Sequence, residues 1–244
     1  DKLLSIGALE QAQAMLEVAT PDTPELYRRW FDVSLLTGTE DTACRSLRVK
    51  PDVAPTPSAR IFCLARAGDW SAAALTLNTG LALGDIDADT GDLLARFLDP
   101  ELYEGEPDLT PPDRITPLTF RMFEAIGDAQ GTRNLPSAFS HADLRQNVGW
   151  KAQLEAAERL SRDGAVSFGV LTSLYRARAP AASGGVWERA KAVQRLDRAL
   201  ENEDSGETLV ALDALWDEAA SLGLVVPLAK NYGVQLHAAE LPAR

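Results

Sequence analysis

Three neighbouring residues in the middle of the chain have the side-chain types of a nucleophilic catalytic set. Ser140, His141 and Asp143 could supply a nucleophile, a base and an orienting carboxylate. Adjacent residues on one helical turn point in different directions, which argues against a catalytic set and leaves it as the alternative. The spacing Ser140-x-x-Asp143 resembles a capping box with aspartate in place of glutamate. We therefore interpret these residues as the start of a helix.

His237 is the second of the two histidines, and we expect it on the surface of a C-terminal tail. Two isolated histidines without a cluster of cysteines and histidines argue against a structural zinc site. We expect neither a metal nor a cofactor.

Carboxylates are plentiful, and a pair of them across one cleft would suit glycoside hydrolysis. Most of them lie on the polar faces of predicted helices near arginines, as Glu158 does with Arg162 at a spacing of i,i+4, so ordinary helix pairing explains them. A self-contained hydrolase that uses carboxylates is an alternative that we keep open. The candidates are Glu155, Glu158, Glu188, Glu201 and Glu203.

A short glycine-containing segment, Ser183-Gly184-Gly185, comes directly before a predicted helix. Backbone amides at a helix start can hold an anion. No Lys-Ser/Thr pair follows, so the segment is not a phosphate-binding loop. We regard Ser183 and Trp187 as candidate binding residues, and a plain flexible cap is the alternative.

Cys44 and Cys63 are the only cysteines. They fall in two predicted helices that are antiparallel neighbours in a stack of helical hairpins. We predict that they form a disulfide, which by loop closure would stabilise the fold by roughly 3 kcal/mol. Two buried free thiols are the alternative.

The positions of these residues depend on a recurring pattern of glycine, alanine five residues later and leucine nine residues later. The first three copies start 31 and 30 residues apart. In each copy, we expect a left-handed glycine to end one helix, the alanine to allow close helix packing and the leucine to fill the core. A period in this range predicts an all-α fold, a right-handed superhelix of antiparallel helix hairpins. The copies are Gly7/Ala12/Leu16, Gly38/Ala43/Leu47, Gly68/Ala73/Leu77 and Gly206/Ala211/Leu215.

A proline-rich and acidic stretch interrupts this pattern. We expect helical repeats over residues 1–98, a linker or long surface loop over 99–117, and a second helical unit over 118–244. Prolines at this density block regular helix. The acidic side chains predict a solvated face, with a docking strip for a basic partner as the alternative.

The pattern resembles the second helix of tetratricopeptide-like repeats. Residues 7–24 match every small, large and proline position of that helix, through Gly7, Leu9, Ala12, Leu16, Ala19 and Pro24. Residues 68–77 match its first four positions. The resemblance implies an α-solenoid that binds a protein or peptide in a concave groove without chemistry of its own. The superhelical region of bacterial lytic transglycosylases is also similar, which implies cell-wall association as an alternative.

Composition limits the partners and the compartment. The chain has 244 residues and a net charge of -12, so the phosphate backbone of a nucleic acid would repel it. Five lysines against 19 arginines, with abundant alanine, resemble proteins of GC-rich bacterial genomes. No apolar run is long enough to span a membrane. The start at Asp1 suggests a removed signal or a piece of a longer protein. With the disulfide we expect the bacterial periplasm, and without it the cytoplasm.

In stacked hairpins the first helices line the concave face. We therefore expect a partner to contact arginine and aromatic side chains of two such helices, because these types are common binding anchors. In the alternative, the arginines balance nearby acids such as Glu25, Asp32 and Asp41. We predict a non-catalytic binding scaffold of the bacterial cell envelope, with the helical part of a peptidoglycan-acting enzyme as the alternative. The candidate groove residues are Arg28, Arg29, Trp30, Arg60 and Arg66.

Overall fold

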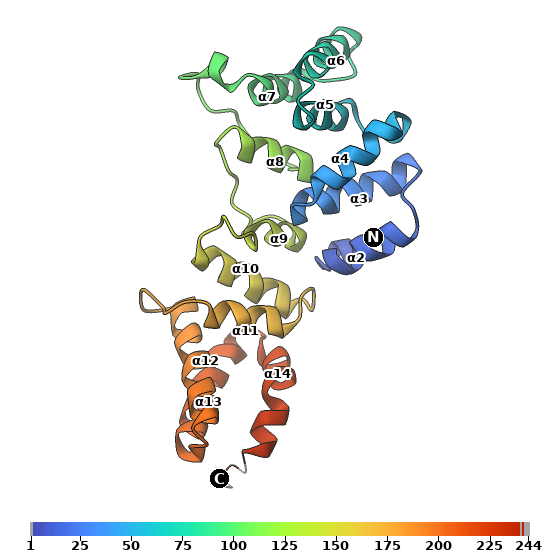
Figure 1. Cartoon of the computed structure of the whole chain (residues 1–244). Helices are drawn as coiled ribbons and strands as arrows, with labels where there is room; N and C mark the ends of the chain where they lie inside the picture. The colour runs from blue at the N-terminus through green and yellow to red at the C-terminus, as the bar shows by residue number, and fades with distance from the viewer. Residues whose placement is uncertain (1, 240, 242–244) are drawn as a thin grey trace. The chain divides into compact units, whose positions relative to one another are not determined.

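The computed structural model describes residues 2–239 and 241, and this part of the chain is helical, with 69% helix and no strand. The expectation of an all-α protein is confirmed. The helices, shown in Figure 1, are α1 (Lys2–Ser5), α2 (Leu9–Val18), α3 (Pro24–Thr37), α4 (Glu40–Val49), η1 (Pro51–Val53), α5 (Pro57–Arg66), α6 (Trp70–Leu83), α7 (Ala88–Leu98), η2 (Pro100–Tyr103), α8 (Pro117–Ala125), η3 (Ser137–Phe139), α9 (Ser140–Asp143), α10 (Trp150–Arg162), α11 (Phe168–Arg176), α12 (Val186–Glu201), α13 (Ser205–Ser221) and α14 (Val225–Ala238).

The helices form two compact units. The α2–α8 unit is Leu9–Leu135, and the α9–α14 unit runs from Pro136 onward and also includes the segment up to Ala8. The predicted boundaries at 98 and 118 differ from this division, because α8 packs against α3 and α7. Leu118, Met122 and Phe123 of α8 lie in the same hydrophobic core as α3 and α5.

The proline-rich stretch at 99–117 is a surface loop of the α2–α8 unit. Arg96 of α7 fastens it, since Nη1 donates a hydrogen bond of 2.8 Å to the carbonyl of Pro107. The Arg96 guanidinium also lies 5.5 Å from the centre of the Tyr103 ring. Of the two predicted forms, linker or long loop, the structure has the loop.

The left-handed glycine of the recurring pattern is confirmed in three of the four copies. Gly7, Gly38 and Gly68 have φ angles of 80°, 79° and 80°, the left-handed conformation that ends a helix. The fourth copy is wrong for its glycine, because Gly206 lies inside α13. There α12 ends at Glu201, and the left-handed residue that follows it is Glu203, a non-glycine residue with a φ of 53°. The alanines of all four copies are buried, as predicted.

The α2–α8 unit has an aromatic core. Tyr27, Phe31, Phe62 and Phe97 follow one another with ring centres 6.0, 6.2 and 5.4 Å apart. The Tyr27 hydroxyl donates a buried hydrogen bond of 2.7 Å to the carbonyl of Ala43. This core therefore joins α3, α4, α5 and α7.

The α9–α14 unit contains a buried ion pair. Arg189 of α12 donates two hydrogen bonds of 2.6 and 2.7 Å to Glu158 of α10. Tyr175 of α11 donates a third, of 2.6 Å, to the same carboxylate. All three residues are buried, so this cluster fixes the contacts among α10, α11 and α12.

His141 has a structural place in this unit. Its Nε2 lies 2.5 Å from the carbonyl oxygen of Gly7, and the imidazole is buried. The imidazole thus holds the segment before α2.

Within the described residues, no helix is both long and apolar enough to cross a membrane.

Candidate functional site

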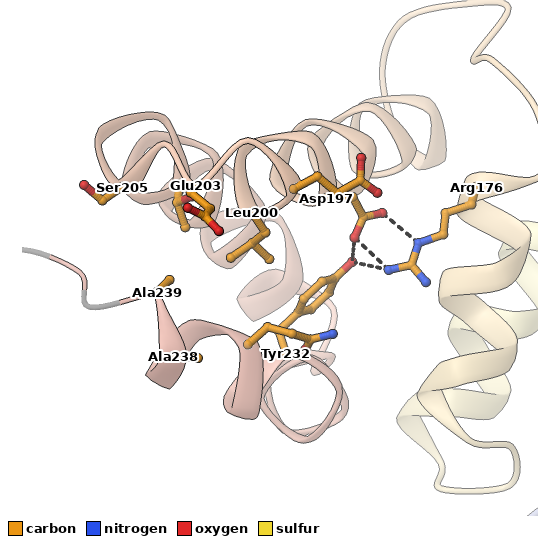
Figure 2. A pocket seen from close by; sticks show the side chains of 11 residues that line it. Arg176, Asp197, Leu200, Glu203, Ser205, Tyr232, Ala238 and Ala239 are labelled. Carbon is orange, nitrogen blue, oxygen red and sulfur yellow. Dashed lines mark hydrogen bonds and ion pairs between the residues drawn. The ribbon is translucent and has the colours of Figure 1, made fainter.

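The α9–α14 unit has an open cleft of about 1000 Å³ (Figure 2). It lies where α14 diverges from the hairpin of α12 and α13, and α11 contributes Arg176. Its wall is polar at one end and mixed along the rest. The residues that line it are Arg176, Asp197, Leu200, Glu201, Glu203, Ser205, Thr208, Tyr232, Gln235, Ala238 and Ala239.

Local sequence explains why the hairpin turns at the edge of this cleft. Asp204 caps α13 by accepting a hydrogen bond of 2.9 Å from the amide of Glu207. The amide of Asp204 in turn donates to the carbonyl of Ala199, which closes α12. This tight turn presents Glu203 and Ser205 to the cleft.

One end of the cleft is closed by a network of three side chains (Figure 2). Arg176 donates two hydrogen bonds of 2.7 Å to the Asp197 carboxylate. The Tyr232 hydroxyl donates a bond of 2.8 Å to Asp197, and Arg176 donates one of 3.2 Å to that hydroxyl. Every charged group here therefore has a partner of opposite charge.

The electrostatics of this network favour the ion pair and a neutral tyrosine. Burial and the adjacent Asp197 carboxylate raise the pKa of Tyr232. The hydrogen bonds to Asp197 raise the pKa of Arg176. Tyr232 therefore stays protonated at neutral pH, and the network can position a ligand but offers no unpaired base.

The remaining cleft carboxylates are different. Among the described residues, the exposed side chains of Glu201 and Glu203 have neither a hydrogen-bond nor an ion-pair partner, and the side-chain amide of Gln235 likewise has no hydrogen-bond partner. Leu200 lies between Glu203 and the closed end (Figure 2). The lining of the cleft thus combines the apolar side chain of Leu200 and the ring of Tyr232 with two free carboxylates.

Sequence reasoning missed this cleft because it missed α14. The prediction treated the chain around His237 as a tail, whereas α14 runs from Val225 to Ala238. The missed signal is the spacing of Leu224, Leu228, Tyr232 and Leu236, one apolar residue every four positions. Pro227 obscured it, although proline is tolerated in the first turn of a helix.

The predicted site at Ser183–Trp187 divides into two features. The amide of Gly184 donates a hydrogen bond of 3.1 Å to Glu188, so the chain's own carboxylate occupies the predicted anion position. That bond is the main reason why the pKa of Glu188 is lowered. Ser183 is exposed and takes no part in this contact. Trp187 lies elsewhere, at a hollow of about 530 Å³ beside Trp150.

The two tryptophans of this hollow differ in whether the indole N–H has a hydrogen-bond acceptor. Their ring centres lie 5.1 Å apart. The indole N–H of Trp150 donates a bond of 2.8 Å to the carbonyl of Leu174. Within the described part of the chain, the indole N–H of Trp187 has no acceptor, and the guanidinium of Arg178 at the same hollow has no partner. Trp187 is therefore available to a ligand.

The predicted groove residues of the α2–α8 unit have separate surroundings. The expectation for Trp30 is wrong, because its side chain is buried against Tyr27, with ring centres 5.7 Å apart. Arg29 donates to the carbonyl of Glu25. Arg28 is exposed, and its positive charge partly offsets the burial that raises the pKa of Asp32. Arg60 lines a hollow between α5 and α6. A binding role for the arginines stays a prediction.

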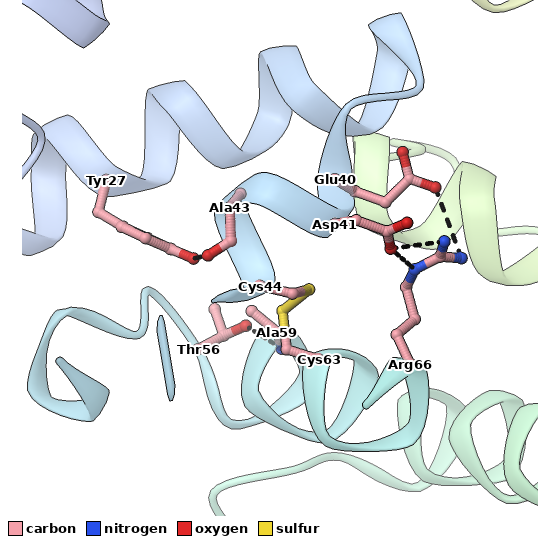
Figure 3. Close-up of a disulfide and its surroundings, with 9 residues drawn as sticks. All are labelled: Tyr27, Glu40, Asp41, Ala43, Cys44, Thr56, Ala59, Cys63 and Arg66. Carbon is pink, nitrogen blue, oxygen red and sulfur yellow. Dashed lines mark hydrogen bonds and ion pairs between the residues drawn. A yellow bond between two sulfur atoms is a disulfide. The ribbon is translucent and has the colours of Figure 1, made fainter. Parts of the chain in front are cut away.

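Arg66 lies in an ion-pair cluster close to the two cysteines (Figure 3). Its Nη2 is 2.7 Å from Asp41, and its Nη1 is 3.6 Å from the buried carboxylate of Glu40. Arg121 of α8 also binds Glu40, at 2.7 Å. The alternative expectation, that Arg66 balances a nearby acid, is what these contacts support.

The predicted pairing of Cys44 with Cys63 is confirmed. The two residues form a disulfide with Cα atoms 5.0 Å apart, between α4 and α5 (Figure 3). Among the described residues, no group of histidines, cysteines and carboxylates is arranged to hold a metal ion.

Comparison of this chain with protein-family models, with curated proteins and with solved structures finds no match. The resemblance to tetratricopeptide-like repeats therefore rests on the residue pattern alone.

Reduction of the disulfide should destabilise the protein. The bond closes a loop over a sequence separation of 19 residues, so its loss should lower the free energy of unfolding by roughly 3 kcal/mol. Urea unfolding with and without a phosphine reductant measures this change. The double variant Cys44→Ala/Cys63→Ala is the control and should not respond to reductant. Two titratable thiols per unreduced chain would contradict the disulfide.

Asp32 should make stability depend on pH. Burial raises the pKa of Asp32 to about 6, against a smaller lowering by Arg28. Between about pH 4 and 6 the folded chain then holds a proton that the unfolded chain has released, so stability should fall as pH rises through this window.

Asp32→Asn should remove this pH dependence and raise the free energy of unfolding above about pH 6, by roughly 2 kcal/mol. Urea unfolding on both sides of the window measures it. Asp92→Asn, an exposed helical aspartate, is the matched control and should keep the slope of the wild type. An unchanged slope in Asp32→Asn would contradict the assignment.

Proposed function

We propose that the chain is a non-catalytic helical scaffold that binds a basic segment of a protein or peptide in the cleft of the α9–α14 unit. The observation that carries the proposal is that two free carboxylates, Glu201 and Glu203, line the same cleft as Leu200 and the ring of Tyr232. A lysine or arginine of the partner would pair with these carboxylates. An adjacent apolar side chain would pack on Leu200 and Tyr232.

The rigid wall of the cleft supports binding over chemistry. Arg176, Asp197 and Tyr232 satisfy one another, so they keep their geometry without a ligand. A preformed wall reduces the ordering cost of binding. The excess of negative charge on the chain would also increase the rate of encounter with a basic partner.

The setting of the proposal is the bacterial cell envelope, with the helices arranged as a right-handed superhelix of the tetratricopeptide-like kind. The disulfide supports an oxidising compartment such as the periplasm. The buried alanines at helix contacts support close hairpin packing.

The double variant Glu201→Gln/Glu203→Gln should weaken binding of basic peptides. Each exposed ion pair contributes up to about 1 kcal/mol, so we expect the Kd to rise by roughly fivefold at low salt, and by less as salt screens the charges. Fluorescence anisotropy with labelled peptides in which two lysines flank one apolar residue measures the Kd.

The matched control is Glu104→Gln/Glu106→Gln, which makes the same charge change on exposed residues of the other unit. It should leave the Kd within about twofold, since its carboxylates lie far from the cleft in sequence and belong to a separate unit. Equal weakening by both double variants would show non-specific attraction and would refute the cleft.

A second candidate function is contact with cell-wall glycan at the tryptophan hollow. It rests on the free N–H and partly open ring of Trp187 beside Trp150. The face of a sugar ring carries C–H groups that can pack on an indole, and its hydroxyls can accept the N–H.

Trp187→Ala should then reduce co-sedimentation of the protein with insoluble peptidoglycan by several-fold. Trp70→Ala removes a tryptophan that is 54% exposed in the other unit, and it should change nothing. Glycan binding at this hollow is excluded if Trp187→Ala sediments as the wild type does.

A further inference from the structure

Helix α6 carries no charged side chain. Its sequence is Trp-Ser-Ala-Ala-Ala-Leu-Thr-Leu-Asn-Thr-Gly-Leu-Ala-Leu, from Trp70 to Leu83. A surface helix normally has a charged or strongly polar outer face, and a helix that is apolar on all sides is normally buried. In α6, however, Leu75 is 69% exposed and Leu83 is 71% exposed. This face lacks a covering element within the described chain.

The exposed leucines border a groove of about 510 Å³. One wall is the α6 stripe of Leu75, Thr79 and Leu83, and the opposite wall is formed by residues 54–57 at the start of α5. Prolines 55 and 57 make that wall rigid, since their φ angles are fixed. The groove is thus a preformed apolar slot along an uncharged helix.

The spacing of the leucines is symmetric. Leu75 and Leu83 stand four residues on either side of Thr79, and a rise of 1.5 Å per residue separates them by about 12 Å along the helix. If two α6 helices pack antiparallel about Thr79, Leu75 of each meets Leu83 of the other. An isologous contact of this kind needs one surface that complements itself.

The charged side chains that line the groove can also complement themselves in a symmetric contact. Arg60 and Asp85 both line it, and within the described residues neither side chain has an ion-pair or hydrogen-bond partner. One free positive and one free negative group let Arg60 of one copy face Asp85 of a second. A net charge of -12 would repel two copies elsewhere, so an uncharged helix beside a balanced pair of charges is the surface on which they can meet.

We infer that the α6 groove, lined by Leu75 and Leu83 along α6 and by the charged side chains of Arg60 and Asp85, is a self-association surface that binds a second copy of this chain. The contact is small, because α6 is only about 21 Å long. Small interfaces belong to the weak and transient class. The dimer should therefore form in a concentration-dependent way.

Sedimentation velocity of the full chain over a concentration series, up to about 1 mM, tests this inference. The wild type should pass from monomer to dimer without larger species. Leu75→Glu or Leu83→Glu should raise the dissociation constant at least about tenfold, because each places an unpaired carboxylate in the contact. Leu102→Glu is the control, since Leu102 is 70% exposed and lies outside the groove, and it should dimerise as the wild type does.

Charge reversal tests the symmetry of the contact. Arg60→Asp and Asp85→Arg should each weaken the dimer several-fold, and the double variant should recover the wild-type constant to within about twofold. These substitutions lie in the α2–α8 unit, so their effect is separable from peptide binding in the cleft. A wild type that stays monomeric throughout, larger oligomers, or equal dimerisation by Leu75→Glu and Leu102→Glu would each overturn the inference.

Discussion

The α9–α14 unit depends on a charge that is kept out of water. Glu158 is buried, and burial of an ionised carboxylate is costly unless its oxygens are satisfied. Here Arg189 and Tyr175 bond the carboxylate from two other helices, and Arg189 also approaches Glu218 of α13 at 3.5 Å. Because the bonds are directional, α10, α11, α12 and α13 have little freedom to slide past one another. The contacts of Arg189 with Glu158 and Glu218 therefore hold the α12–α13 hairpin, which forms one side of the cleft, in place.

A second set of arginine, carboxylate and tyrosine, more exposed to solvent, lies at the closed end of the cleft. Arg176 and Asp197 pair between α11 and α12, and Tyr232 joins them from α14. A hydroxyl between two opposite charges can donate to one and accept from the other. Tyr232 thus connects α14, the most divergent helix of the unit, to the hairpin that it faces. The cleft exists because α14 is held at this point and diverges beyond it.

Local rules predicted much of the fold. The glycine, alanine and leucine pattern correctly predicted helix ends at Gly38 and Gly68 and a buried position for Ala43. Those roles depend on backbone conformation and on side-chain size. The disulfide followed from the placement of two cysteines on neighbouring helices. The cleft could not be predicted in this way. Tyr232 and Arg176 are 56 residues apart, and nothing local to either residue indicates the other.

Charge was also hard to interpret from sequence alone. One arginine that was interpreted as a binding anchor, Arg66, has partners within the chain, Asp41 and Glu40. The free charges of the cleft are the carboxylates of Glu201 and Glu203, which in sequence look like any solvated helix end. Whether a charge is paired depends on packing between helices, and the spacing of residues along one helix does not determine it.

The contact between His141 and Gly7 has a consequence for biosynthesis. It joins residues 134 positions apart, and the whole α2–α8 unit lies between them in sequence. A ribosome releases the chain from its N-terminus, so the α2–α8 unit can fold while the segment before it still lacks its partner. Once folded, the α2–α8 unit replaces a long flexible loop by a compact body, which reduces the entropy lost when Gly7 meets His141. The order of synthesis thus favours folding of the α2–α8 unit before the contact between Gly7 and His141 completes the α9–α14 unit.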